Sequence, residues 1–142
     1  MRESAGKFRE KERAIGVYLV AGYAALVHRR PEDHTREGWK MPDAIVRYGP
    51  DDPGRITEFK TLTKTTTTAV KNDIIRAGGQ LAPYGGGDVV IDGRNVGLTE
   101  DVARRGYVRA AGQARQHGQP MPQRARIILG DSRTIDLGEE AT

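Results

Sequence analysis

Two carboxylates and one amine in this chain have types and spacings that suit phosphodiester hydrolysis. Asp43 follows a proline, and after fourteen intervening residues comes the triplet Glu58, Phe59 and Lys60. Because side chains alternate along a strand, Glu58 and Lys60 are expected to project from one face and Phe59 from the other. Two neighbouring strands would then bring Asp43 and Glu58 together, with Lys60 beside them.

Such an arrangement predicts a site for a divalent cation. Two carboxylates at that separation repel each other unless a positive charge lies between them. Hard oxygen ligands favour Mg²⁺ or Mn²⁺, and the backbone carbonyl of Phe59 is a further candidate ligand. Lys60 would orient or activate the attacking water and neutralise charge on the phosphorane. The alternative is a surface hairpin on which Glu58 and Lys60 are ordinary solvated residues.

A third carboxylate, Glu12, falls on the apolar stripe of a predicted helix. It shares that stripe with Phe8, Ile15 and Leu19. A carboxylate on a core-facing stripe is unfavourable unless it is paired or bound to a metal. Glu12 is therefore a candidate third ligand of the same cation, the alternative being a basic neighbour that draws it outward at the start of the helix.

The elements that must position these residues form an α/β pattern along the 142 residues, interpreted as a single domain. Helices are predicted over about 8–21, 68–81 and 99–116, and strands over about 23–28, 43–48, 55–62, 88–91, 126–129 and 134–137. Turn residues between 49 and 54 join the second and third strands into a hairpin. This order predicts a small α/β domain with a mixed central β-sheet flanked by helices. The ends, residues 1–6 and 138–142, are expected to fray.

Composition narrows the class of partner. The chain has 23 Lys and Arg against 19 Asp and Glu, a formal net charge of +4, and it has no cysteine. The excess of positive charge favours polyanionic partners, since neutralising phosphates releases counterions. The lack of cysteine excludes thiol nucleophiles and disulfides. No apolar run reaches the length of a membrane span, so we expect no membrane insertion.

Weaker candidates for contacts to a nucleic acid follow the site and recur on the third predicted helix. Hydroxyls and amines at the head of a helix, and arginines around a helix surface, suit phosphate groups. A solvated turn and plain solubility are the alternatives. The residues concerned are Thr61, Thr63, Lys64, Lys71, Arg104, Arg105 and Arg109.

Between Glu10 and Ile91, these residues together resemble the PD-(D/E)XK nuclease superfamily. More narrowly, the chain looks like the C-terminal toxin domains of contact-dependent growth inhibition proteins, the CdiA-type tRNase domain. That resemblance implies that Glu12, Asp43 and Glu58 hold the metal and that Lys60 assists catalysis.

The resemblance also implies a place of action and a partner. It implies a bacterial endonuclease that is secreted as part of a larger effector, delivered to the target-cell cytoplasm and neutralised by a dedicated immunity protein. An inhibitor covering a basic cleft is expected to be acidic. RNA, particularly tRNA, is the favoured substrate. The alternatives are a DNA endonuclease, as a toxin or of the resolvase or restriction type, and a non-catalytic basic module that binds nucleic acid.

Overall fold

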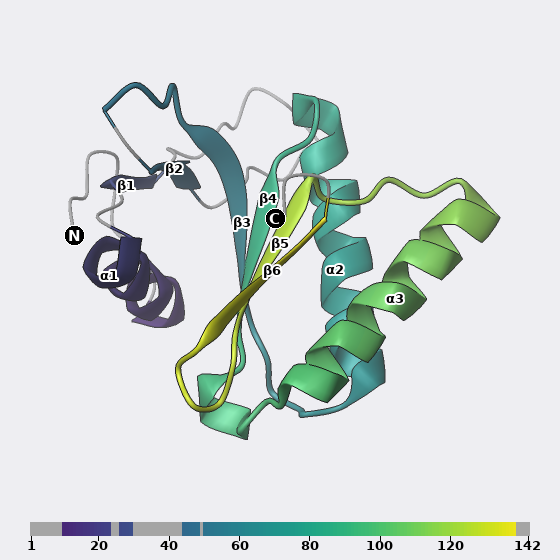
Figure 1. The fold of residues 1–142 in the computed structure, drawn as a ribbon. Coiled ribbons are helices and arrows are strands. Elements are labelled where there is room, and N and C mark those ends of the chain that lie inside the picture. Colours follow the sequence, from purple (N-terminus) through teal and green to yellow (C-terminus); the bar gives the residue numbers. More distant parts are fainter. Residues whose placement is uncertain (1–9, 24–25, 30–43, 49, 139–142) are drawn as a thin grey trace.

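The computed structural model describes residues 10–23, 26–29, 44–48 and 50–138. The elements are α1 (Glu10–Tyr23), β1 (Leu26–Arg29), β2 (Ala44–Arg47), β3 (Arg55–Thr61), α2 (Thr67–Leu81), β4 (Asp88–Asp92), α3 (Glu100–His117), β5 (Arg124–Ile128) and β6 (Thr134–Gly138), with short 3-10 helices at Ala82–Tyr84 and Arg94–Val96. The strands form one sheet in sequence order, with β3–β4 and β4–β5 parallel and the other pairs antiparallel. The predicted fold class, a small α/β domain with a mixed sheet flanked by helices, is confirmed (Figure 1).

Two expectations about boundaries were wrong. We expected the first helix to end before Gly22 and a strand to begin at Tyr23, but α1 runs through Tyr23 and β1 begins at Leu26. A glycine inside a helix costs only about 1 kcal/mol, so it does not force a stop. Gly138, expected to lie in a frayed end, pairs with Arg124 as the last residue of β6.

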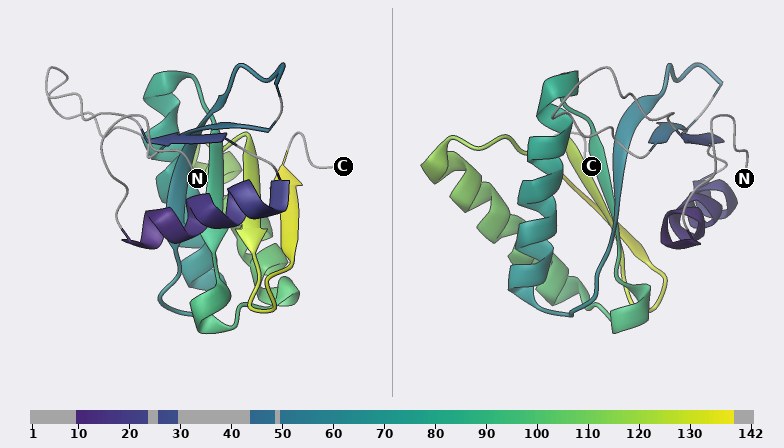
Figure 2. Two further views of the ribbon diagram at one scale, coloured as in Figure 1. Left: turned by 90° about the vertical axis from the view of Figure 1, so that its left-hand side faces the viewer. Right: turned by 180° about the vertical axis from the view of Figure 1, so that it is seen from behind.

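The helices divide between the two faces of the sheet. Helix α1 covers one face, and α2 and α3 cover the other (Figures 1 and 2). α2 links the parallel strands β3 and β4, and α3 links β4 and β5; crossovers of the same hand that progress in one direction across a sheet put both helices on one face. Each face therefore has its own apolar core. The α1 core includes Ile15, Leu19, Phe59, Val90 and Ile128, and the α2–α3 core includes Val70, Ile74, Val89, Ile91 and Ile127.

Threonines begin both crossover helices. The Thr66 hydroxyl accepts a hydrogen bond from the backbone N–H of Ala69, and the Thr99 hydroxyl accepts one from Val102. Thr99 is the N-cap of α3, with Glu100 and Asp101 at the positive end of the helix dipole. Among the described residues, no helix combines the length and apolar character needed to span a membrane.

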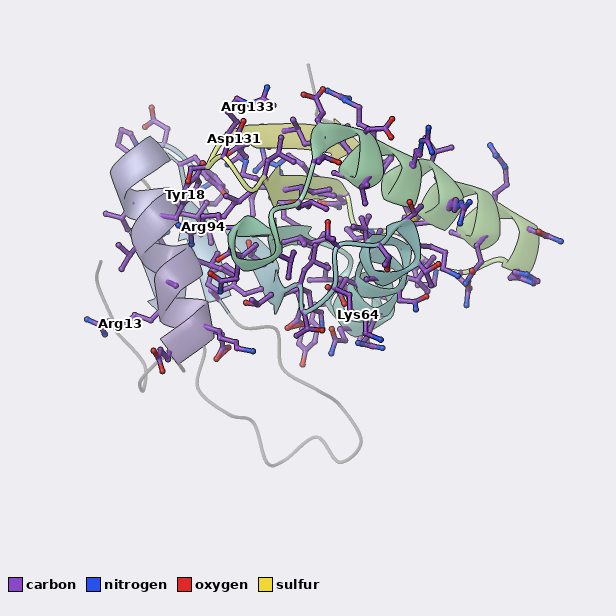
Figure 3. All side chains as sticks on the ribbon, turned by 90° about the horizontal axis from the view of Figure 1, so that it is seen from below. Arg13, Tyr18, Lys64, Arg94, Asp131 and Arg133 are labelled. Atoms are coloured by element: carbon purple, nitrogen blue, oxygen red, sulfur yellow. The ribbon has the colours of Figure 1, made fainter. Side chains whose placement is uncertain are left out.

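Helix α1 is tied to two distant parts of the chain by polar contacts. The Tyr18 hydroxyl donates to the carbonyl of Ser132 at 2.6 Å. The Arg94 guanidinium lies 4.9 Å from the centre of the Tyr18 ring and donates to the carbonyl of Ala14 at 3.3 Å. Figure 3 shows Tyr18 and Arg94 together between α1 and the rest of the molecule. These contacts fix α1 against the sheet, in addition to its apolar stripe.

The close packing of α2 on α3 depends on Gly106. A Cβ atom there would lie 2.5 Å from the Cβ of Val70, whereas one on Gly112 of the same helix would meet nothing within 4 Å. We predict that Gly106→Ala lowers the free energy of unfolding by about 1–3 kcal/mol through overpacking. Gly112→Ala should raise it by about 0.5–1 kcal/mol, because alanine favours helix. Urea denaturation measures both, and equal shifts of the two midpoints would contradict the packing argument.

Candidate active site

Glu58 and Lys60 project from the same face of β3, as the alternation predicted. Glu58 pairs in register with Val89 and Lys60 with Ile91, two residues of the α2–α3 core. Phe59 points to the other face and belongs to the α1 core. The Glu58 side chain is 1% exposed, whereas Lys60 is half-buried. The solvated-hairpin alternative is therefore wrong for Glu58, which is buried on an interior strand.

Asp43 lies outside the described residues. Ala44, the residue after it, pairs with Thr57, the residue before Glu58. The predicted hairpin of β2 and β3 is thus present, and the chain neighbours of the two carboxylates are paired across it.

Glu12 belongs to a helix on the other face of the sheet. It is half-buried and precedes Ile15 by one turn, on the stripe that packs against Phe59. Glu58 and Lys60 point away from that stripe, towards α2. The structure thus brings Glu58 and Lys60 to one face of the sheet and places the helix that carries Glu12 on the opposite face.

Helix α2 presents polar residues as well as apolar ones to this region. Asp73 has a side chain that is 16% exposed. Burial raises the pKa of its carboxyl, and the charges of Lys60 and then Arg76 act in the opposite direction. Seven residues further on, at a spacing that returns to the same side of a helix, the Oε1 atom of Gln80 is buried and lacks a hydrogen-bond partner within the described chain.

Sequence reasoning did not single out Asp73. Its signal was an acid one residue from the apolar stripe of Val70, Ile74 and Ala77. Such a position is common on exposed helix surfaces. The charge of Lys60 acts on Asp73 only in the folded chain, where β3 and α2 pack together.

The residues proposed for phosphate contacts differ in their surroundings. Thr63 and Lys64 are exposed in the turn before α2, and Thr61 and Lys71 are half-buried. Figure 3 shows Lys64 beside the start of α2 and apart from Arg13 on α1. These positions leave Lys64 accessible to a large polyanion.

The arginines of α3 are partly neutralised. Arg104 pairs with Glu100 at 2.7 Å and Arg105 with Asp101 at 3.2 Å, both one turn away on the same helix. Arg109 is exposed and forms no ion pair with any described residue. Exposed pairs of this kind stabilise the helix by a few tenths of a kcal/mol, so they do not prevent contacts to phosphate but do reduce the local excess of charge.

A further charged network, which sequence reasoning missed, lies on the α1 face. Asp88 is 1% exposed and accepts hydrogen bonds from Arg55 at 2.7 Å and Arg124 at 2.8 Å. The guanidiniums of Arg124 and Arg126 stack on the ring of Tyr48, with distances of 5.1 and 4.6 Å to its centre. Arg124 and Arg126 alternate along β5 in the pattern that puts both on one face, which was the available signal. Arg55 and Arg124 thus join β3 and β5 to Asp88 of β4, and Arg126 pairs with Asp136 of β6.

No group of three or more His, Asp or Glu side chains arranged for a metal occurs in the part of the chain that the structure describes, which leaves out Asp43. Glu58 offers a carboxylate and Phe59 a backbone carbonyl from adjacent positions of one strand. A carboxylate buried to 1% exposure is costly unless positive charge compensates it. These residues fit a hard divalent cation by the chemistry of their oxygen donors.

Comparisons with known proteins support the fold. No family model and no curated protein sequence matches the chain. The chain is similar in structure to one in the "CdiA-CT/CdiI toxin and immunity complex from Burkholderia pseudomallei", with a TM-score of 0.52 and 11% identity. The match covers 96% of this chain and 98% of that one. At this level of identity the likeness shows a shared fold across almost the whole length of both chains.

Proposed function

We propose that this chain is a toxin domain with metal-dependent endonuclease activity, which hydrolyses phosphodiester bonds of RNA, with tRNA as the first candidate. The observation that carries the proposal is the pair of Glu58 and Lys60 on one face of an interior strand, with Glu58 buried to 1% exposure. The fold shared with a chain of a toxin and immunity complex supports the biological role.

The chemistry follows from the residues of β3. Mg²⁺ or Mn²⁺ would be held by the Glu58 carboxylate and the Phe59 carbonyl, with Asp43 proposed as a further ligand. When bound, such a cation supplies a Lewis acid and lowers the pKa of bound water. The Lys60 ammonium would orient the attacking water and stabilise the charge that builds on the phosphoryl oxygens during attack.

Glu12 is not proposed as a direct ligand of the cation, because α1 covers the face of the sheet opposite Glu58. Its carboxylate and that of Glu58 originate on opposite sides of β3. We propose Glu12 as an outer acid of the site and expect Glu12→Gln to reduce cleavage less than Glu58→Gln does. An equal loss from the two variants would instead assign Glu12 a direct role.

The similar structure is a complex of a toxin and its immunity protein, and the charge of this chain favours the role of the toxin. The net charge of +4 suits a polyanionic substrate. We propose that the domain acts in the cytoplasm of a target cell after delivery as part of a larger effector, and that a cognate acidic immunity protein blocks it until then.

We predict that the purified chain cleaves RNA in the presence of Mg²⁺ or Mn²⁺ and not in EDTA. Glu58→Gln, Asp43→Asn and Lys60→Met should each lower the rate by about 100-fold or more, since each removes a charge needed in the transition state. Parallel reactions on total tRNA, ribosomal RNA and plasmid DNA, followed on gels, measure activity and substrate class.

Glu100→Gln is the matched control. Glu100 is a solvent-facing acid of α3 that pairs with Arg104. Its removal should leave cleavage unchanged within about twofold, because exposed pairs contribute little. Undiminished cleavage by Glu58→Gln, or by the wild type in EDTA, would refute the proposed site. Cleavage of DNA alone would retain the site and replace the substrate.

We also predict that the immunity protein binds chiefly through charge. The probe is the product of an acidic reading frame adjacent to the gene for this chain, and its binding is measured by calorimetry. Its Kd should rise by about tenfold or more between ~50 and ~500 mM NaCl, because screening weakens attraction between exposed charges. An affinity independent of salt would contradict an interface built on the basic surface.

A further inference from the structure

Helix α3 leaves the body of the molecule along its second half. Its first half packs on α2, where Gly106 lies against Val70. Towards its C-terminal end, α3 inclines away from α2 (Figures 1 and 2). Val108, Arg109 and residues 115–120 are exposed. The second half of α3 is therefore open to a partner on the side that faces away from the sheet.

The positive charges of this half are not offset by acids. The chain has no Asp or Glu between Asp101 and Asp131, a stretch that contains six arginines. Four of the six pair with an acid of the chain, namely Arg104, Arg105, Arg124 and Arg126. Arg109 and Arg115 form no ion pair with any residue that the structure describes. The arginines of α3 are thus neutralised in its first half and uncompensated in its second.

The two uncompensated arginines flank a position that has no side chain. At 100° and 1.5 Å per residue of a helix, Arg109 and Arg115 lie about 120° apart around the axis and about 9 Å apart along it. Gly112 lies midway between them in both respects. A Cβ atom on Gly112 would meet nothing within 4 Å. A partner can therefore approach the backbone of α3 closely between two guanidiniums.

The chemistry of this surface fits a nucleic acid better than a protein. A guanidinium binds phosphate oxygens through two parallel N–H groups. Val108 is the one large hydrophobic residue of α3 that is exposed, and the exposed residues after Arg115 include Gln116, His117 and Gln119. Interfaces between proteins have an apolar core. Interfaces with nucleic acids are more polar and more positively charged, as this surface is.

We propose that the outer side of α3 from Val108 to His117, here called the α3 surface, docks the phosphate backbone of an RNA and is centred on Gly112. The inference deepens the proposed function and rests on it, since it takes RNA as the substrate. It assigns affinity for RNA chiefly to Arg109 and Arg115. Because phosphate contacts carry no sequence information, the α3 surface supplies affinity and does not choose the bond that is cleaved.

A glutamate at the centre of the α3 surface tests the proposal. Gly112→Glu places a negative charge midway between the two arginines, in space that is open. Binding of fluorescently labelled tRNA is measured by anisotropy in EDTA, so that binding is separated from cleavage. The Kd should rise by about tenfold or more, because the new carboxylate repels phosphates and pairs with the cations that bind them.

Gly79→Glu is the matched control. Gly79 is exposed on α2, a Cβ atom there would also meet nothing within 4 Å, and the substitution changes the net charge by the same amount. It should raise the Kd for tRNA by less than about twofold. Equal rises from the Gly112 and Gly79 variants would overturn the inference, because the overall charge of the chain would then account for binding.

Two pairs of arginine variants provide a second measurement, which also decides the matter if Gly112→Glu does not fold. Arg109→Gln with Arg115→Gln should raise the Kd about tenfold and lower the salt slope of binding by about 1 per arginine. Arg104→Gln with Arg105→Gln removes the same charge and should raise the Kd by at most about threefold, because acids of the helix already offset those arginines. Similar effects from the two pairs would refute the α3 surface.

The binding and cleavage measurements can fail separately. If the wild type binds tRNA in EDTA through the α3 surface but cleaves no nucleic acid with Mg²⁺ or Mn²⁺, the proposed function fails and the α3 surface stands. If the wild type cleaves RNA and Gly112→Glu binds tRNA as tightly as the wild type does, the inference fails and the proposed function stands. Weaker binding of the immunity protein by Gly112→Glu, with tRNA binding unchanged, would assign the surface to a protein and overturn the inference.

Discussion

The arrangement depends on one constraint, which is that the Glu58 carboxylate is kept out of water on an interior strand. β3 has β2 on one side and β4 on the other, and α2 lies over the face from which Glu58 projects. Withdrawing a carboxylate from water costs several kcal/mol unless nearby charges and donors compensate it. Lys60, two residues along β3 on the same face, brings a positive charge to that side of the sheet.

The opposite face solves a similar problem in a different way. There Asp88 is as deeply buried as Glu58, but it receives charged hydrogen bonds from Arg55 and Arg124. That pairing links three adjacent strands and is satisfied by the protein itself. Asp88 is therefore part of the scaffold, whereas Glu58 shares the α2 face of β3 with Lys60. That shared face is the reason to place chemistry on the α2 side.

The sequence predicted much of this because its signals were local. The period of two separated Glu58 and Lys60 from Phe59, the turn residues predicted the hairpin, and Thr99 marked the start of α3. The sequence did not predict which face of the sheet each helix covers. A helical stripe shows that Glu12 lies near a core, but not which face of the sheet that core covers. The pairing of Arg55 with Asp88, 33 residues apart, likewise requires strands that meet only after folding.

The positions of the helices also determine which cations a nucleic acid could contact. On the α2–α3 side, Arg104 and Arg105 are occupied by acids of their own helix. Lys64, Lys71 and Arg109 form no ion pair with any residue that the structure describes. Lys64 lies in the turn between β3 and α2, Lys71 on α2 and Arg109 on α3, so these charges and the candidate chemistry share one side of the sheet. Phosphate contacts alone give affinity without sequence preference. Selection of one RNA would therefore have to come from its shape, which cations placed on α2, on α3 and in the turn before α2 could read.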